Sequence, residues 1–308
     1  MIRVVAACTW PNKGVMQLKS ILCPVDFSDF SIAAYRHALS LAEYYKARLL
    51  ALHVIEIWKY PFADYGAHEA DYAKFSHAMN EGGEVKLQSF VKEFSAGGVQ
   101  PELVVHQGNA PNCVLSCAEK HKVEMIVMGT HGRRGLDRLV LGSTTDRVIR
   151  RALCPVLVVS SASQTALNTA ADGTHRLRRI LYCTDFSNNS EQARGYAISV
   201  AAEYDAELIL LHVVDDSADQ SKAEASIAQR KQGLDKLASE TGSKNVKVNA
   251  VVKVGKPYEE IARYATESQA SLIIMTARGG DAMDRAVFGS TTYRVIQLGP
   301  CPVLAVHT

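Results

Sequence analysis

The residues best suited to chemistry form a glycine-rich segment in the first half of the chain. Gly129-Thr130-His131-Gly132 is followed by nine residues and then by Gly142-Ser143-Thr144. Glycines let backbone N–H groups approach an anion without obstruction, and a helix that begins near Ser143 directs its positive dipole end at the same place. Arg133 and Arg134 in the connection can reach outer phosphates. The pattern therefore predicts a loop that binds phosphate groups.

Other familiar chemistries are not indicated. No lysine precedes Ser143, as a Walker loop would require, and no metalloprotease or serine hydrolase signature occurs. Cys113, Cys117 and His121 share one helix face, which invites a metal hypothesis, but three ligands from a single helix are a weak basis for a site. His53 is more simply interpreted as a packed, hydrogen-bonded residue than as a catalytic one.

The chain contains an internal repeat, and each copy has its own version of this loop. The segment from Ile21 to Ser28 matches that from Ile180 to Ser187 at an offset of 159 residues, whereas Gly142-Ser143-Thr144-Thr145 meets Gly289-Ser290-Thr291-Thr292 at an offset of 147. The first copy therefore holds about twelve extra residues, for which a surface loop is the natural place. We place them between Glu56 and Glu69, a segment rich in aromatic residues.

The repeat divides the chain into four parts. We expect an N-terminal extension over residues 1–15, a first domain over 16–160, a linker over 161–175 and a second domain over 176–308. The linker is rich in Ser, Ala, Thr and Asn and lacks apolar periodicity. The sequence leaves open whether residues 1–15 are native, because Met16 is an alternative start.

Each copy alternates short β-branched runs with segments of helical period. In the first copy the pattern predicts strands over 20–25, 48–54, 101–107, 124–128 and 156–159, and helices over 30–45, 68–94, 110–120 and 144–151. Ser28, Asp29 and Asn109 are expected as N-caps. Nearly continuous apolar strands are typical of parallel sheets covered by helices on both faces. The sequence thus predicts an α/β protein with two tandem doubly wound five-stranded parallel sheets, whose ligands bind beyond the carboxyl ends of the strands.

Composition excludes several classes of partner. The 34 basic and 32 acidic residues are interspersed, so no strong field attracts nucleic acid or a membrane surface. No apolar run approaches the length needed to span a bilayer. The seven cysteines are odd in number and scattered, which argues against a secreted disulfide framework. We therefore expect a cytoplasmic protein.

The glycine motif, together with Val25-Asp26-Phe27-Ser28 at the start of the copy and Cys154-Pro155-Val156-Leu157 at its end, closely resembles the ATP-binding branch of the universal stress protein family. Two such copies are similar to its tandem members. The resemblance implies a Rossmann-like, adenine nucleotide alpha hydrolase-like fold and ATP as the ligand, and it leaves open whether Mg²⁺ accompanies it. It also implies that the two domains pair through their last strands as an intrachain pseudo-dimer, while a further homodimer and a protein partner stay open.

The resemblance also implies roles for individual residues. Asp26 faces the ribose or adenine, the backbone of Val54 meets the adenine edge, and the glycine loop carries ribose and phosphates. The alternative for Asp26 is a turn or N-cap residue. The residues expected to bind nucleotide are Pro24, Asp26, Val54, Met128, Gly129, Gly132, Arg133, Gly142, Ser143 and Thr144 in the first copy, and Asp185, Val213, Gly279, Gly289, Ser290 and Thr291 in the second.

The second copy departs from the motif. Thr276 stands where the first copy has Gly129, and since that glycine is expected to serve close approach to the sugar, a Cβ there should weaken the site. Asp281 and Asp284 also replace Arg134 and Asp137, which disfavours a triphosphate. Nucleotide binding by the second copy is left open.

Three functions fit the sequence. The first is a regulatory stress-response module that binds ATP and signals through occupancy. The second is a slow ATP hydrolase or phosphotransferase in which His131, Asp137 or Asp146 positions water. The third is a scaffold with vestigial nucleotide sites whose aromatic insertion, from Trp58 to Tyr65, docks a partner protein. The absence of an evident general base favours the first, with no catalytic residue assigned.

Overall fold

The computed structural model describes residues 18–56, 69–94, 98–130, 141–160, 177–215, 220–242, 246–278 and 289–307. Domain 1 consists of β1 (Ser20–Pro24), α1 (Asp29–Tyr45), β2 (Arg48–Ile55), α2 (Glu69–Phe94), β3 (Glu102–Gln107), α3 (Ala110–Lys120), β4 (Met125–Gly129), α4 (Ser143–Arg151) and β5 (Val156–Val159). Domain 2 consists of β6 (Arg179–Cys183), α5 (Asn188–Glu203), β7 (Glu207–Val214), α6 (Gln220–Gly242), β8 (Val248–Val254), α7 (Pro257–Glu267), β9 (Leu272–Thr276), α8 (Ser290–Leu298) and β10 (Val303–Val306).

The elements of domain 1 agree with those predicted to within one residue at each end. Two of the three expected N-caps are confirmed, because the side chain of Ser28 accepts from Ser31 N and that of Asn109 accepts from Asn112 N. The third was wrong, since Asp29 is the first residue of α1. Its negative charge still favours that end of the helix, because the first turn carries the positive end of the dipole.

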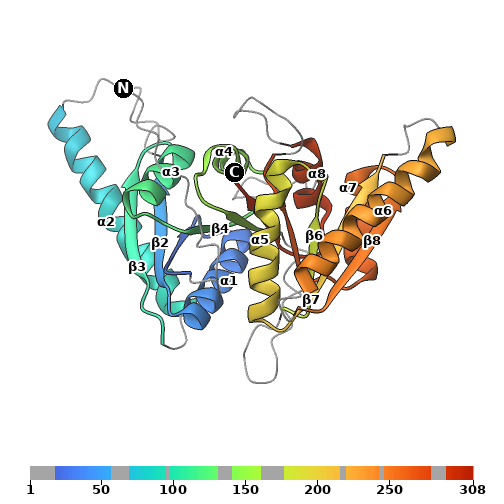
Figure 1. Cartoon of the computed structure of the whole chain (residues 1–308). Coiled ribbons are helices and arrows are strands. Elements are labelled where there is room, and N and C mark those ends of the chain that lie inside the picture. The colour runs from blue at the N-terminus through green and yellow to red at the C-terminus, as the bar shows by residue number, and fades with distance from the viewer. Residues whose placement is uncertain are drawn as a thin grey trace, which may run out of the picture.

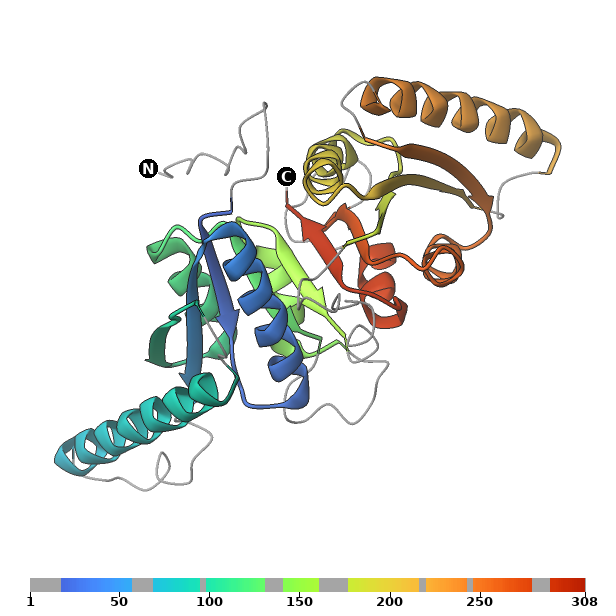
Figure 2. The same cartoon turned by 90° about the horizontal axis from the view of Figure 1, so that it is seen from below.

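All ten strands form one sheet in the order β3-β2-β1-β4-β5-β10-β9-β6-β7-β8. Strands within each domain are parallel, as the near-continuous apolar runs predicted, and the order reverses between β1 and β4 and again between β6 and β9. The two halves join where β5 and β10 pair antiparallel, with Leu157 opposite Leu304. Figure 1 shows the two domains side by side around this pair, and Figure 2 shows the same arrangement from below. The pairing of last strands that the resemblance implied is therefore present.

Helices cover both faces of the sheet. One face packs against α1, α2, α5 and α6 and contains the large buried side chains Tyr35 and Tyr182. The other packs against α3, α4, α7 and α8 around Ile126, Ile149 and Ile273. Each apolar cluster draws residues from both domains. The core is thus continuous across the β5–β10 pair.

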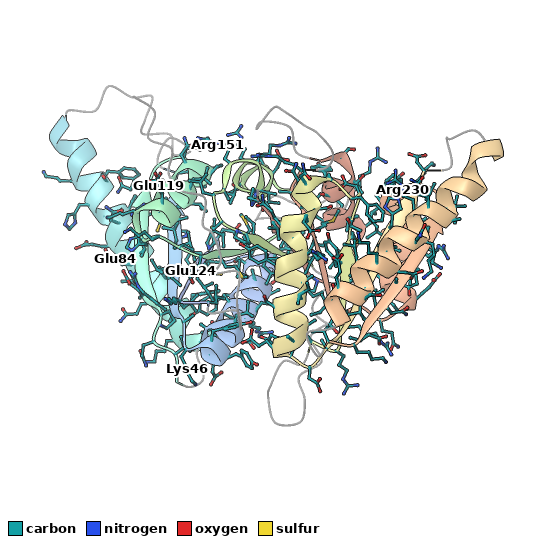
Figure 3. The ribbon with its side chains drawn as sticks, in the orientation of Figure 1. Lys46, Glu84, Glu119, Glu124, Arg151 and Arg230 are labelled. Carbon is teal, nitrogen blue, oxygen red and sulfur yellow. The ribbon has the colours of Figure 1, made fainter. Side chains whose placement is uncertain are left out.

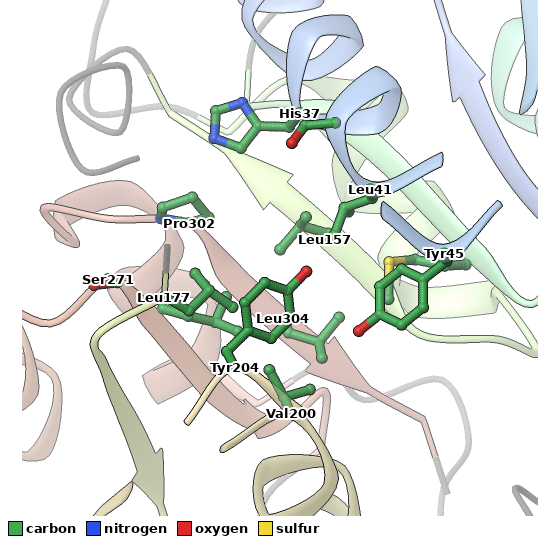
Figure 4. A pocket seen from close by; sticks show the side chains of 13 residues that line it. His37, Leu41, Tyr45, Leu157, Leu177, Val200, Tyr204, Ser271, Pro302 and Leu304 are labelled. Atoms are coloured by element: carbon green, nitrogen blue, oxygen red, sulfur yellow. The ribbon is translucent and has the colours of Figure 1, made fainter. Parts of the chain in front are cut away.

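Contacts between α1 and α5 hold the domains together on one face of the sheet. The rings of Tyr44 and Tyr204 stack with centroids 4.7 Å apart, and Tyr45 Oη donates to Glu203 Oε2 at 2.8 Å. Near these contacts lies a cavity of about 60 Å³ that is lined by Tyr45 and Tyr204 and by Leu157 and Leu304 of the central strands (Figure 4). Its walls come from both domains, so the interface is a shared interior rather than two separate surfaces.

A second contact joins the domains at the opposite face. His307, which follows β10, donates from Nε2 to the backbone carbonyl of Ile149 in α4. A carbonyl only accepts, so Nε2 carries the proton and Nδ1, which is buried without a hydrogen-bond partner, carries the lone pair. Burial, with a smaller contribution from the charge of Arg278, lowers the pKa of His307 from 6.5 to about 4, although the backbone at Ile149 and Cys154 acts in the opposite direction. The imidazole is therefore neutral at physiological pH.

Gly129 at the end of β4 allows α1 to approach the sheet closely. A Cβ at this position would lie 2.8 Å from both the Cβ and the carbonyl oxygen of Phe30. In domain 2 the equivalent residue is Thr276, which is buried and has a Cβ. Gly129 thus has a packing role in addition to the approach to a sugar that we expected of it.

We expect Gly129→Ala to lower the free energy of unfolding by about 1–3 kcal/mol, because the new methyl group meets backbone atoms that cannot rotate away. Gly195→Ala in α5 is the matched control, since a Cβ there meets nothing within 4 Å. The control should stabilise slightly, as glycine is a poor helix former. Denaturant midpoints measure both, and equal stability of the two variants would contradict the packing role.

Stability should also fall at low pH through His307. Between pH 6.5 and about 4 the unfolded chain binds a proton that the folded chain does not, so the free energy of unfolding decreases as the pH falls through this range. The expected loss is at most about 3 kcal/mol. The measurement is the difference in stability between wild type and His307→Gln as a function of pH, because other titrating groups cancel. A constant difference would show that His307 is not held neutral.

Candidate functional site

The turn from β1 into α1 holds Asp26 in a fixed position. Asp26 Oδ1 accepts from the backbone N of Ser28 at 3.1 Å and from its Oγ at 2.6 Å. Between them, Phe27 has a φ of 66°, a left-handed conformation that is costly for a bulky residue. Domain 2 repeats the turn with Asp185, Phe186 at a φ of 62° and Ser187. The turn interpretation of Asp26 is therefore correct in geometry, while a role toward a nucleotide stays a prediction.

The histidines at the ends of β2 and β7 are part of the same turns. His53 Nδ1 donates to Val25 O at 2.8 Å, and the centroid of its ring lies 4.5 Å from the ring centroid of Phe27. His212 Nδ1 donates to Thr184 O at 2.8 Å. Burial lowers the pKa of His212, so it is neutral at physiological pH. Both histidines are packed, hydrogen-bonded residues, as we expected for His53.

The long glycine-rich loop is closed at its base. Thr130 N donates to Val159 O of β5 at 3.0 Å, and Gly142 N donates to Thr130 O at 2.8 Å, so the two ends of the loop meet. The buried hydroxyl of Thr145, in the first turn of α4, donates to Gly129 O at 2.8 Å. We call these contacts among Gly129, Thr130, Gly142 and Thr145 the loop stem. They hold the start of α4 against the end of β4.

Domain 2 has the same stem with different side chains. Ala277 N donates to Val306 O at 2.8 Å, Gly289 N to Ala277 O at 3.1 Å, and Thr292 Oγ1 to Thr276 O at 2.8 Å. The stem does not depend on a glycine at the first position, because Thr276 supplies the same carbonyl. Sequence reasoning missed Thr145 and Thr292, although the repeated Gly-Ser-Thr-Thr motif contains them.

The helices that follow the two stems begin without a side-chain cap. Gly142 is the N-cap of α4 and Gly289 that of α8, and a glycine has no side chain with which to cap the helix that follows it. In contrast, α1 and α5 are capped by Ser28 and Ser187. The first amides of a helix have no intrahelical acceptor. Within the described ranges, no N-cap side chain accepts from these amides at α4 or α8, and Ser143 in the first turn of α4 is exposed.

The structure brings many of the predicted residues of domain 1 to one place. The strand order puts β1 between β2 and β4, so Pro24, Asp26, Val54, Gly129 and Gly142 lie at or near adjacent strand ends, where the order reverses. Adjacent strands are about 4.8 Å apart. Thr144 is partly buried in the first turn of α4.

The remaining predicted residues of domain 1 fall into two groups. Met128 is buried in the core cluster on the α3–α4 side, so its side chain supports the sheet. Gly132 and Arg133, together with His131, Asp137, the aromatic segment from Trp58 to Tyr65, Gly279 and the acidic residues Asp281 and Asp284, lie outside the described residues. In domain 2, Val213 is partly buried at the end of β7. Ser290 is exposed and Thr291 partly buried, like Ser143 and Thr144, whereas Asp185 is exposed and Asp26 is partly buried.

A basic residue that the sequence analysis did not single out lies at the domain 2 turn. Arg230 of α6 places its guanidinium carbon 5.4 Å from the ring centroid of Phe186, at the end of domain 2 where α8 begins (Figure 3). The equivalent residue of α2 is Gly83, where a Cβ would lie 2.8 Å from Ile55 Cδ1. The long helices of the two domains therefore pack differently over otherwise similar turns.

The structure also bears on two other sequence-based hypotheses: that Asp146 positions water, and that Cys113, Cys117 and His121 bind a metal. Asp146 accepts from Arg150 Nε at 2.9 and 3.0 Å, an ion pair within α4. His121 Nδ1 lies 3.0 Å from Arg48 Nη2, and burial raises the pKa of Cys117 to about 11. Among the described residues, no group of three or more His, Cys, Asp or Glu side chains is placed to hold a metal ion. No helix in the described part of the chain is long and apolar enough to cross a membrane.

Comparison with known proteins agrees with this architecture. The sequence pattern of the universal stress protein family matches residues 17–160 and again residues 176–307. A universal stress protein of Methanocaldococcus jannaschii is 38% identical over 148 residues, which are 48% of this chain and 85% of that protein. One from Mycolicibacterium smegmatis is 26% identical over 302 residues, covering 93% of this chain and 96% of that protein.

A solved structure is similar over nearly the full length. The crystal structure of a universal stress protein from Archaeoglobus fulgidus superimposes with a TM-score of 0.71 at 22% identity, covering 95% of this chain and 99% of that one. At this identity the likeness shows the fold. The repeated family match supplies the rest: this chain belongs to the universal stress protein family and carries two of its domains in tandem.

Proposed function

We propose that this protein is a regulatory module that binds ATP in domain 1 and acts through the occupancy of that site. The observation that carries the proposal is the loop stem together with the uncapped start of α4. Gly142 N donates to Thr130 O, so the loop base is fixed, while no N-cap side chain in the described part of the chain accepts from the following amides of the helix. A phosphate group is the acceptor that such a helix start favours.

The fit of a nucleotide can be followed along the strand ends. The triphosphate would lie against the first turn of α4, with the exposed hydroxyl of Ser143 beside it. The sugar and base would then extend over the ends of β4, β1 and β2 toward Asp26 and Val54. The Asp26 carboxylate is already oriented by Ser28, so little ordering is needed on binding. Mg²⁺, if it accompanies ATP, would neutralise phosphate charge.

Domain 2 is proposed to bind nucleotide more weakly. It keeps the stem and the uncapped helix start, but its aspartate is exposed and Arg230 covers the neighbouring Phe186. Thr276 also adds a side chain at the end of β9. These differences change the sugar end of the site more than the phosphate end.

Regulation by binding is favoured over hydrolysis. A water-positioning group must be within hydrogen-bond reach of the attacking water. Of the three candidates named from the sequence, His131 and Asp137 lie outside the described residues, and the carboxylate of Asp146 is paired with Arg150. We therefore assign no catalytic residue.

The test is equilibrium binding of labelled ATP to wild type, Gly142→Asp and Gly289→Asp. We expect Gly142→Asp to weaken binding at least about tenfold, because a carboxylate at the N-cap occupies the helix start and repels phosphate. Gly289→Asp makes the matched change in domain 2 and should leave most of the binding intact. Equal affinity of wild type and Gly142→Asp would rule out the proposed site.

A further inference from the structure

The contact between His307 and Ile149 crosses from domain 2 into the helix that begins at the candidate site of domain 1. His307 follows β10, and Val306 just before it accepts the hydrogen bond from Ala277 N in the stem of domain 2. Its imidazole reaches α4 on the opposite side of the β5–β10 pair. His307 thus follows a residue that is bonded to the domain 2 stem, and its own side chain binds the helix of domain 1.

The carbonyl that His307 binds has no donor within its own helix. The last four carbonyls of an α-helix lack intrahelical partners. Because α4 ends at Arg151 and Ala152 N donates to Val148 O, the next carbonyl, that of buried Ile149, needs a donor from elsewhere. His307 supplies it. Domain 2 therefore provides the hydrogen bond that ends a helix of domain 1.

This bond holds the end of α4, and other hydrogen bonds hold its start. At its start, Gly142 and Thr145 bind the carbonyls of Thr130 and Gly129. Ile149 is six residues after Ser143, which is about 9 Å along the helix axis. Arg151 adds a bond to Asn112 Oδ1 at 3.0 Å, but both groups are exposed. A helix this short moves as a rigid rod, so a shift of its buried end also displaces its first amides.

The side chain at the position of His307 differs between the two domains. The residue of domain 1 equivalent to His307 is Ser160, and the carbonyl equivalent to that of Ile149 belongs to Ile296 in α8. A serine side chain is much shorter than an imidazole.

We propose that His307 is a positioning residue for the nucleotide site of domain 1, so that domain 2 forms part of the framework of that site. The inference rests on the proposed function of domain 1 and extends it: the affinity of one domain for ATP depends on a side chain of the other. His307 does not contact the nucleotide. It acts through α4 by holding the helix that offers its first amides to the phosphates.

The test compares His307→Leu with His307→Gln in full-length protein that also carries Gly289→Asp, so that domain 1 is measured alone. Leucine removes the donor and leaves Ile149 O without a partner, whereas the glutamine amide can reach the same carbonyl. We expect His307→Leu to weaken ATP binding roughly five- to tenfold and His307→Gln to stay within about twofold of the parent. A loss of the same size in both variants would show that bulk, and not the hydrogen bond, matters.

Tyr44→Phe is the control for general weakening of the domain interface. It removes the bond from Tyr44 Oη to Glu203 O, which also crosses between the domains but lies at the far end of α1 from the loop stem. We expect unchanged ATP affinity in this variant. If Tyr44→Phe lost as much affinity as His307→Leu, any loosening of the interface would suffice and the specific role of His307 would be wrong.

Amide hydrogen exchange without nucleotide gives an independent measurement. We expect faster exchange over residues 143–151 in His307→Leu and restored protection in His307→Gln. ATP binding by wild type together with unchanged affinity and exchange in His307→Leu would overturn this inference and leave the proposed function standing. No ATP binding by wild type would overturn both.

Discussion

The antiparallel pairing of β5 with β10 is the interaction on which the arrangement of both candidate sites depends. Each of these strands lies at the inner edge of its domain, and each supplies the carbonyl that anchors a loop stem, Val159 O in domain 1 and Val306 O in domain 2. An unpaired edge strand leaves its outer backbone groups exposed to solvent or to other chains. By pairing, the two edges become the centre of one sheet. The stems are thus built on strands that are buried along their whole length.

The fold could be predicted closely because its signals are local and repeated. Apolar strands separated by helical segments indicate a parallel sheet. Because the chain contains two copies, each predicted boundary of a helix or strand can be compared between them. The family resemblance added the pairing of the last strands. Residues whose role is local, such as Ser28 as an N-cap, were also predictable, because capping requires only neighbours in the sequence.

The candidate site was less predictable where roles depend on contacts between distant segments. Gly129 was expected to make room for a sugar. A Cβ at this position would also collide with the backbone at Phe30, which lies more than ninety residues earlier in the chain. Thr145 looks like one of several hydroxyls in the motif until the sheet brings it to Gly129 O. Arg230 and His307 belong to no motif. Each acquires its role only when a helix or strand from elsewhere is placed against it.

Joining two domains in one chain changes what substitution can do to an interface of this kind. When two identical subunits pair about a two-fold axis, every residue is present on both sides, and a single codon changes both partners together. Here the equivalents of His307 and Ile149 are Ser160 and Ile296, so one half can gain a long donor while the other keeps a short one. When the two domains are encoded in one chain, the residues on the two sides of the interface can therefore change independently. One domain can then come to support the site of the other.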